Sequence, residues 1–149
     1  MNTSRALATA ATAFGGLLAG ATADRWIVQI PALHELGLTT WSDYSRHADL
    51  SLRGFAFYPT VGIGHAILTV ATAIVADGKM RTPARVAAIL ALSGMATTLK
   101  AAPFMLSVRH LGHNPRELEM ARRGFEFWSA IRAACQVGAF AANVLTLAK

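Results

Sequence analysis

Residues 55–108 decide the fold of this chain, and they read FAFYPTVGIGHAILTVATAIVADGKMRTPARVAAILALSGMATTLKAAPFMLSV. Two apolar runs, residues 55–76 and 83–108, are separated only by the short polar segment 77–82. A hydrocarbon core about 30 Å thick is crossed by roughly 20 apolar residues in a helix, so both runs are long enough to span a bilayer. Segment 77–82 is too short for anything but an antiparallel connection, and Pro83 suits the first turn of a helix. We therefore expect a transmembrane helical hairpin.

Two further segments of the same kind flank this hairpin, at residues 6–30 and 124–148, and Pro31 marks the expected end of the first. The chain of 149 residues is 54% hydrophobic and only 15% charged, with a mean hydropathy of +0.40. Such a composition is typical of membrane proteins rather than soluble domains. We predict one integral membrane domain, residues 1–149: an all-α, antiparallel four-helix bundle with up-down-up-down topology and no sheet.

The first segment also resembles a secretory signal peptide. Arg5, the apolar stretch after it and the small tripeptide ATA at 21–23 fit such a peptide and its cleavage site. The apolar run resumes beyond that tripeptide with WIV at 26–28. A retained membrane helix is therefore the better interpretation.

Composition and charge exclude several other classes. The formal charge of +6 raises the question of nucleic acid, but the basic residues are scattered and no recognition signature accompanies them. Cys135 is the only cysteine, which excludes a disulfide framework and a thiolate zinc site. The distribution of Lys and Arg does not settle which side the termini face, although we favour the inside. The end that carries loops 32–54 and 109–123 is called the outer end below.

Every predicted span carries an ionisable residue, and such residues usually face the interior of a membrane bundle and are candidates for function. Asp24, His65, Lys100 and Arg132 are the four candidates. Each lies on a stripe of small or polar residues at helical spacing, so we expect four polar stripes to face one another. The stripes are Thr9, Thr12, Gly16, Gly20 and Asp24; Tyr58, Gly62, His65, Thr69 and Thr72; Ser93, Thr97, Lys100 and Ser107; and Ser129, Arg132, Gln136 and Asn143.

At about 1.5 Å of rise per residue, these four ionisable residues converge on the outer half of the bundle. The pattern predicts a polar pocket that is entered from the outer end. Lys100, Arg132 and Arg25 outweigh Asp24 and Glu126, so the pocket would keep a net positive charge. An anionic ligand or reaction intermediate would balance that charge.

Structural roles compete with the functional ones. Asp24 paired with Arg132 or Lys100 would lock the bundle, and His65 could be a hydrogen-bonded packing residue. The pattern GLLAG at 16–20 lets helices approach closely. An aromatic belt at the membrane boundary would explain Trp26, Trp41 and Trp128.

Histidines near the outer end raise the alternative of a transition metal. His110 and His113 are three residues apart, and His34 and His47 belong to the same end. However, Gly112 and the following Asn-Pro interrupt a helix there, and no HExxH or Glu-x-x-His pattern is present. We expect no metal and no cofactor.

Short motifs along nearly the whole chain carry a resemblance to a known family. They are Ala19-Gly20, Asp24-Arg25-Trp26, Pro31-Ala32-Leu33, Trp41 and Tyr44 before Pro59, Asn114-Pro115, and Phe125, Trp128 and Arg132. The chain resembles the small four-span anthrone oxygenases and their largely uncharacterised bacterial relatives. This resemblance implies a protein of the bacterial inner membrane. For characterised relatives it implies a monooxygenase, an oxidoreductase that converts an anthrone to an anthraquinone with molecular oxygen in polyketide pathways, without an established cofactor.

Removing a proton from an anthrone needs a base, a positive pocket for the oxyanion and a dry cavity. We assign His65 as the base, Lys100 and Arg132 as anion stabilisers, and Asp24 as the group that orients or balances one of them. The aromatic residues expected to bind the flat substrate are Tyr58, Phe125, Trp128, Trp41 and Tyr44.

The alternative function is a non-catalytic membrane subunit or carrier that binds a lipophilic anion or a quinone. In both interpretations the partners are a lipophilic small molecule and membrane lipid, with no nucleic acid. The sequence leaves the oligomeric state open.

Overall fold

The computed structural model describes residues 3–149, which form helices and turns without any strand. Four of its helical segments are long and apolar enough to cross a membrane, which confirms the predicted all-α membrane bundle. The elements are α1 (Thr3–Asp24), the π-helical turn η1 (Arg25–Gln29), α2 (Ile30–Leu36), α3 (Leu38–His47), α4 (Leu52–Val75), the 3-10 turn η2 (Gly78–Met80), α5 (Arg81–Ser107) and α6 (Pro115–Leu147).

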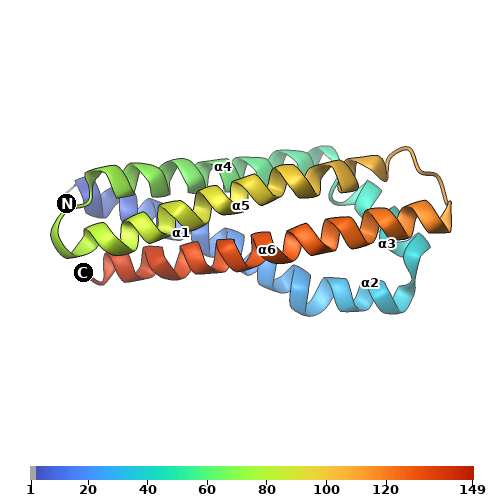
Figure 1. Ribbon diagram of the computed structural model, residues 1–149, viewed down its shortest axis with the longest axis horizontal. Coiled ribbons are helices and arrows are strands. Elements are labelled where there is room, and N and C mark those ends of the chain that lie inside the picture. Colours follow the sequence, from blue (N-terminus) through green and yellow to red (C-terminus); the bar gives the residue numbers. More distant parts are fainter. Residues whose placement is uncertain (1–2) are drawn as a thin grey trace.

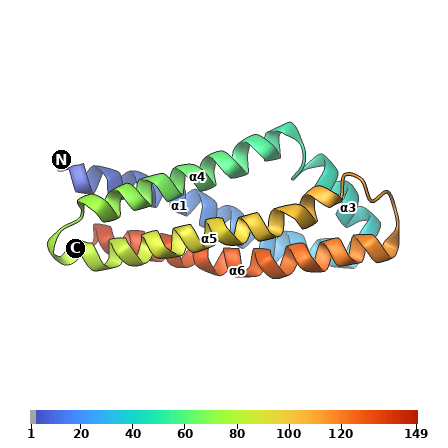
Figure 2. The same cartoon turned by 45° about the horizontal axis from the view of Figure 1, so that its top comes forward.

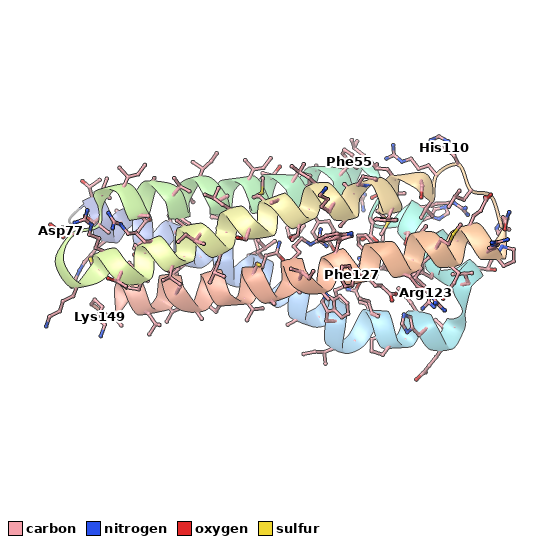
Figure 3. All side chains as sticks on the ribbon, viewed as in Figure 1. Phe55, Asp77, His110, Arg123, Phe127 and Lys149 are labelled. Carbon is pink, nitrogen blue, oxygen red and sulfur yellow. The ribbon has the colours of Figure 1, made fainter. Side chains whose placement is uncertain are left out.

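The four long segments run antiparallel along one axis. Figure 1 shows both chain ends and the turn between α4 and α5 at one end of the molecule, and α2, α3 and the loop before α6 at the other. Asp77 and Lys149 mark the first of these, here called the inner end, while His110 marks the outer end (Figure 3). The arrangement is the expected up-down-up-down topology.

The sequence led us to expect that the first segment ends at Pro31, but the helix continues past this residue. The turn η1 widens the helix, and the backbone N–H of Ile30 bonds to the carbonyl of Arg25, five residues earlier. Proline lacks an N–H and crowds the carbonyl four residues before it, and a widened turn relieves both problems. The helix therefore continues through α2 to Leu36, and α2 leaves the axis of α1 (Figure 1).

Helix α6 begins at Pro115, well before the predicted residue 124. The Asn114 side chain accepts hydrogen bonds from the backbone N–H groups of Arg116 and Glu117, and proline suits the first helical position. With 33 residues, α6 is about 50 Å long, which exceeds a hydrocarbon core of about 30 Å. Its first turns thus extend past the core at the outer end.

Around these first turns of α6, a cluster of buried apolar side chains closes the outer end of the bundle. We call it the outer cap. Its members are Leu33, Trp41, Leu50, Ala101, Met105, Val108, Leu118, Ala121 and Phe125.

Only two of the four predicted polar stripes face the interior. On α4 and α6 the prediction is right, since His65, Thr69 and Thr72, and likewise Ser129 and Asn143, are buried. On α1 and α5 it is wrong: small, mostly apolar residues face inward there, and Asp24 and Lys100 are exposed. The buried residues are Ser4, Ala8, Ala11, Gly15, Leu18 and Ala19 on α1, and Ala84, Ala87, Ala88, Ala91, Gly94, Ala101 and Met105 on α5.

The reason for this reversal is that small side chains allow the closest helix approach, whereas a hydroxyl can be satisfied without a partner helix. Thr97 and Ser107 on α5 each donate a hydrogen bond to a carbonyl of their own helix, of Gly94 and Phe104 respectively. Polar character alone therefore does not determine which face of α5 turns inward.

Helices α1 and α4 interlock at two glycines. A Cβ atom on Gly15 would lie 2.9 Å from Nε2 of His65, and one on Gly64 would lie 2.9 Å from Cε1 of Phe14. Each glycine thus makes room for a side chain of the facing helix. Gly20, which the small-residue pattern indicated as a contact point, has nothing within 4 Å of such a Cβ atom.

Candidate functional site

The four long segments enclose a cavity of about 360 Å³ in the outer half of the bundle. We call it the membrane cavity. This volume lies in the range of small-molecule sites in proteins. Its lining is mostly apolar, with a limited set of polar side chains that come from all four long segments and from the turn before α4. The polar side chains on its wall are Thr22, Arg25, Asp49, Tyr58, His65, Thr98, Ser129, Arg132 and Gln136.

Arg132 provides the positive centre of this wall. Its Nη2 donates a hydrogen bond to Oγ of Ser129 at 3.1 Å, and its Cζ lies 5.8 Å from the ring centroid of Phe125. Among residues 3–149, no carboxylate lies within ion-pair distance of this guanidinium. A cation in a membrane interior without a carboxylate partner is costly, so Arg132 is a candidate for binding an anionic group.

Arg25 lies on the same wall but is neutralised. Its Nη1 and Nη2 donate to the two carboxylate oxygens of Asp49 at 2.6 and 2.7 Å, and the side chains of both residues are 10% exposed. The lining therefore carries two guanidinium groups against one carboxylate, which leaves the predicted positive excess. Arg132 supplies that excess, and Lys100 takes no part in it.

The predicted pairing of Asp24 with Arg132 or Lys100 is wrong. Asp24 is exposed and accepts a hydrogen bond from Nε2 of Gln29, on the next turn of the same segment. Neighbouring residues on a helix point about 100° apart, so Arg25 turns inward where Asp24 turns outward. The carboxylate inside the bundle comes instead from Asp49, in the turn before α4. The only indication of this role in the sequence was the position of Asp49, close to the start of α4.

His65 is almost fully buried, with 2% of its surface exposed, and it lines the cavity as predicted. Its Nε2 lies 3.1 Å from Nδ2 of Asn143, whose amide also reaches Oγ1 of Thr69 at 3.1 Å. If the amide N–H donates to Nε2, the ring proton is on Nδ1; if the amide is turned, its oxygen accepts from Nε2–H and Nδ1 becomes the free base. Asn143 thus sets which nitrogen of His65 can accept a proton.

Lys100 lies outside the membrane cavity, contrary to the prediction. It is exposed on α5, between the exposed Leu99 and the fully buried Ala101. Close packing of Ala101 against the bundle fixes the rotation of α5, and that rotation turns the Lys100 side chain away from the interior.

The five predicted aromatic residues divide between the cavity and the outer cap. Tyr58 and Phe125 line the cavity. Trp41 is 1% exposed within the outer cap, Trp128 packs against that cap, and Tyr44 donates a hydrogen bond to Oε1 of Gln29 at 2.9 Å. Burial raises the pKa of the Tyr44 phenol above its usual value. The three residues outside the cavity are therefore packing residues, because large rings fill the space above α1.

We had expected the cavity to open at the outer end, but it is closed there. Leu50, Met105 and Phe125 belong both to its lining and to the outer cap, so the cap forms its ceiling. All exposed residues of the lining come from α4 and α5, and these two helices diverge toward the outer end (Figure 2). We call this opening the mouth; its rim is Phe55, Tyr58, Pro59, Ile63, Leu99 and Leu106.

The four outer histidines do not form a joint metal site. His34 pairs with Glu126 at 2.7 Å, His47 contacts the backbone carbonyl of Asp43 at 2.8 Å, and His113 lies 3.9 Å from the Asp43 carboxylate. Residues 3–149 contain no group of three or more His, Cys, Asp or Glu side chains placed to hold a metal ion. The described residues thus do not bring His34, His47, His110 and His113 together as one set of ligands.

Comparisons with protein-family models, with curated proteins and with solved structures find no match for this chain. Its class accordingly rests on the fold and the site. The chain is a four-span helical membrane protein with a ligand-sized, net positive cavity in its outer half.

Proposed function

We propose that the protein is a membrane-embedded enzyme that takes a proton from a lipophilic aromatic substrate and stabilises the resulting anion. In the reaction that the family resemblance suggests, it is a cofactor-independent oxygenase of an anthrone-like compound, in the bacterial inner membrane. The observation that carries this proposal is Arg132, a guanidinium without a carboxylate partner on the wall of an apolar cavity that also contains His65.

The proposed reaction balances with oxygen as the only co-reactant. His65 takes one proton from the CH2 group between the two aromatic rings, and Arg132 stabilises the oxyanion that forms when the negative charge moves to the carbonyl oxygen. The carbanion adds O2, the peroxide regains the proton from His65, and the hydroperoxide then loses water to give the second carbonyl. One anthrone and one O2 give one anthraquinone and one water.

The aromatic lining suits a flat substrate. Phe125 is buried on the wall, with its ring centroid 5.4 Å from Cζ of Arg25 and 5.8 Å from Cζ of Arg132, and Tyr58 lies at the mouth. Rings of this kind stack on flat aromatic molecules. Lys100 and Asp24 have no part in the proposed mechanism, because both are exposed outside the cavity.

A second candidate is a carrier that binds a lipophilic anion or quinone without changing it. The hydrogen bond between His65 and Asn143 favours this candidate, because a histidine held in a buried network can be a packing residue. Such a carrier would need Arg132 but not a basic nitrogen on His65.

Turnover of His65→Gln distinguishes the two. We expect oxidation of 1,8-dihydroxyanthrone in lipid nanodiscs, corrected for its spontaneous oxidation, to fall by about 10²- to 10⁴-fold, the usual contribution of a general base. Oxygen consumption should match product one to one. Thr72→Val is the matched control, since it removes a buried hydroxyl of the same helix that donates to the carbonyl of Leu68 and lies outside the cavity wall. Binding of the anthrone by the wild-type protein without oxidation above the spontaneous rate would favour the carrier, whereas wild-type turnover by His65→Gln would show that His65 is not the base.

Arg132 is tested by the ionisation of a bound phenol. A nearby cation favours the ionised form, so we expect 1,8-dihydroxyanthraquinone to form its phenolate at a pH about one to three units lower when bound. Arg132→Met should abolish this shift, and Lys100→Met should preserve it because Lys100 lies outside the cavity. If Lys100→Met abolished the shift and Arg132→Met did not, the assignment of the anion site would be wrong.

A further inference from the structure

The walls of the membrane cavity differ in what covers them. The residues contributed by α1, η1 and α6 are buried or half-buried, whereas the exposed ones all belong to α4 and α5. Leu99 at the rim is 75% exposed, while Ser129 on the opposite wall is 2% exposed. The cavity is therefore closed on three sides and open between one pair of helices.

This opening lies within the membrane-spanning length of the bundle. Phe55 belongs to the first turn of α4, and Ile63 lies about 12 Å further along it, at about 1.5 Å per residue. The mouth thus extends from the outer boundary toward the middle of a core about 30 Å thick. Apart from Tyr58, its rim side chains are all apolar, so hydrocarbon rather than water faces them.

A route from water is blocked at the outer end. The outer cap covers the cavity with Leu50 and Met105, and the paired side chains of Arg25 and Asp49 lie beneath it. A ligand coming from the loops would have to separate both the cap and a two-fold hydrogen-bonded ion pair.

Arg132, Ser129 and His65 lie away from the mouth, whose rim carries the hydroxyl of Tyr58. Ser129 and Arg132 come from α6, on the side of the cavity opposite α4 and α5, and His65 lies on the buried face of α4. A ligand can enter through the mouth with its ionisable oxygen leading. The oxygen then reaches Arg132 while the apolar part of the ligand is still within the mouth.

We propose that the ligand moves between the bilayer and the cavity through the mouth between α4 and α5, oxygen end first. The ligand class that follows is a lipophile dissolved in the membrane, with an acidic oxygen at one end and an apolar body at the other. The proposal rests on the proposed function in one respect, namely that the cavity binds an ionisable lipophile.

Narrowing the mouth tests the route. Leu99→Trp and Ile63→Trp add bulk at exposed rim positions, and Ile89→Trp adds the same bulk to the lipid-exposed face of α5 away from the lining. The probe is 1,8-dihydroxyanthraquinone, followed by stopped-flow absorbance in lipid nanodiscs. A narrowed passage slows association and dissociation by the same factor, about tenfold for a barrier raised by about 1.4 kcal/mol, and leaves Kd unchanged.

Each outcome decides the proposal. Equal slowing in both rim variants, with wild-type rates in Ile89→Trp, supports it. Unchanged rates in the rim variants overturn it, as does faster dissociation alone, because the rim would then be a binding contact rather than a passage. A wild-type protein that fails to bind the probe overturns it together with the proposed function.

A water-soluble probe gives an independent test. Alizarin sulfonate carries a fixed charge that keeps it out of hydrocarbon, so it should associate far more slowly than the uncharged probe at the same aqueous concentration. Equal rates would show access from water and overturn the proposal. Turnover separates the two proposals: slowed exchange at the mouth, in a protein that oxidises the anthrone no faster than its spontaneous rate, would refute only the enzymatic function.

Discussion

The inner and outer halves of the bundle are built differently. In the inner half, alanines without exposed surface bring the helices together, and Thr12, Thr72 and Thr146 each donate a hydrogen bond to the carbonyl four residues earlier. The buried bond from Asn143 to Thr69 is the exception there, since it joins α6 to α4. In the outer half, polar side chains bond between elements, as Arg25 does with Asp49 and His34 with Glu126. The alanines are Ala8, Ala11, Ala84, Ala87 and Ala139.

The difference shows how a small membrane protein can combine a rigid bundle with a cavity. Small side chains and locally satisfied hydroxyls let helices pack closely without any polar partner. Bulky residues such as Phe125 and the widened turn at Arg25–Gln29 hold the helices apart in the outer half, where the cavity forms. The inner half therefore provides the rigid support for a site in the outer half.

The largest expected effect is a loss of folding stability caused by a substitution in the outer half. Asp49→Ala leaves Arg25 buried without its carboxylate, and removing one partner of a buried pair costs about 3 to 5 kcal/mol. Asp24→Ala is the matched control, because it removes a single exposed hydrogen bond and should cost no more than about 1 kcal/mol. Denaturant unfolding in detergent micelles measures both. Equal losses would contradict the contrast between the two carboxylates.

A smaller effect is expected when alanine replaces a glycine in a tight helix contact, compared with a glycine that has open space around it. Gly15→Ala places a methyl group 2.9 Å from Nε2 of His65, and overpacking of this kind costs about 1 to 3 kcal/mol. Gly62→Ala adds the same methyl where nothing lies within 4 Å, so we expect it to stabilise the protein by up to about 1 kcal/mol through helix propensity. The midpoint temperature of thermal unfolding should therefore fall in Gly15→Ala and rise in Gly62→Ala. A Gly15→Ala variant as stable as Gly62→Ala would show that α1 and α4 are not in close contact at Gly15.

The smallest effect concerns the hydroxyl of Tyr44 above the cavity. Because burial raises its pKa above the usual value of 10.0, the folded protein holds this proton more tightly than the unfolded chain. The resulting stability is fully present below about pH 10 and is lost as the pH rises through the folded pKa. Tyr44→Phe should cost about 1 kcal/mol at neutral pH and weaken the loss of stability above pH 10. If the stability of Tyr44→Phe declined above pH 10 as steeply as that of the wild type, the ionisation of Tyr44 would not be a cause of the decline.

The candidate site was only partly predictable. His65 and Arg132 line the cavity as their helical spacing indicated, because α4 and α6 carry long polar stripes that have no other place in a membrane bundle. Lys100 and Asp24 do not, because the rotation of α5 and α1 follows the small residues at their closest contacts. The mouth was not predictable, since it depends on how far α4 and α5 diverge.

The sequence by itself determined the four membrane-spanning helices and their antiparallel order, because the length and hydropathy of a segment decide whether it can cross a bilayer. Only the tertiary structure decided which charges pair and where the cavity opens. Adjacent residues of a helix point about 100° apart, so a small rotation or one widened turn exchanges an inward side chain for an outward one. Asp24 and Arg25 show this most clearly: they are neighbours in the chain, yet one is exposed and the other is bonded to Asp49 inside the bundle.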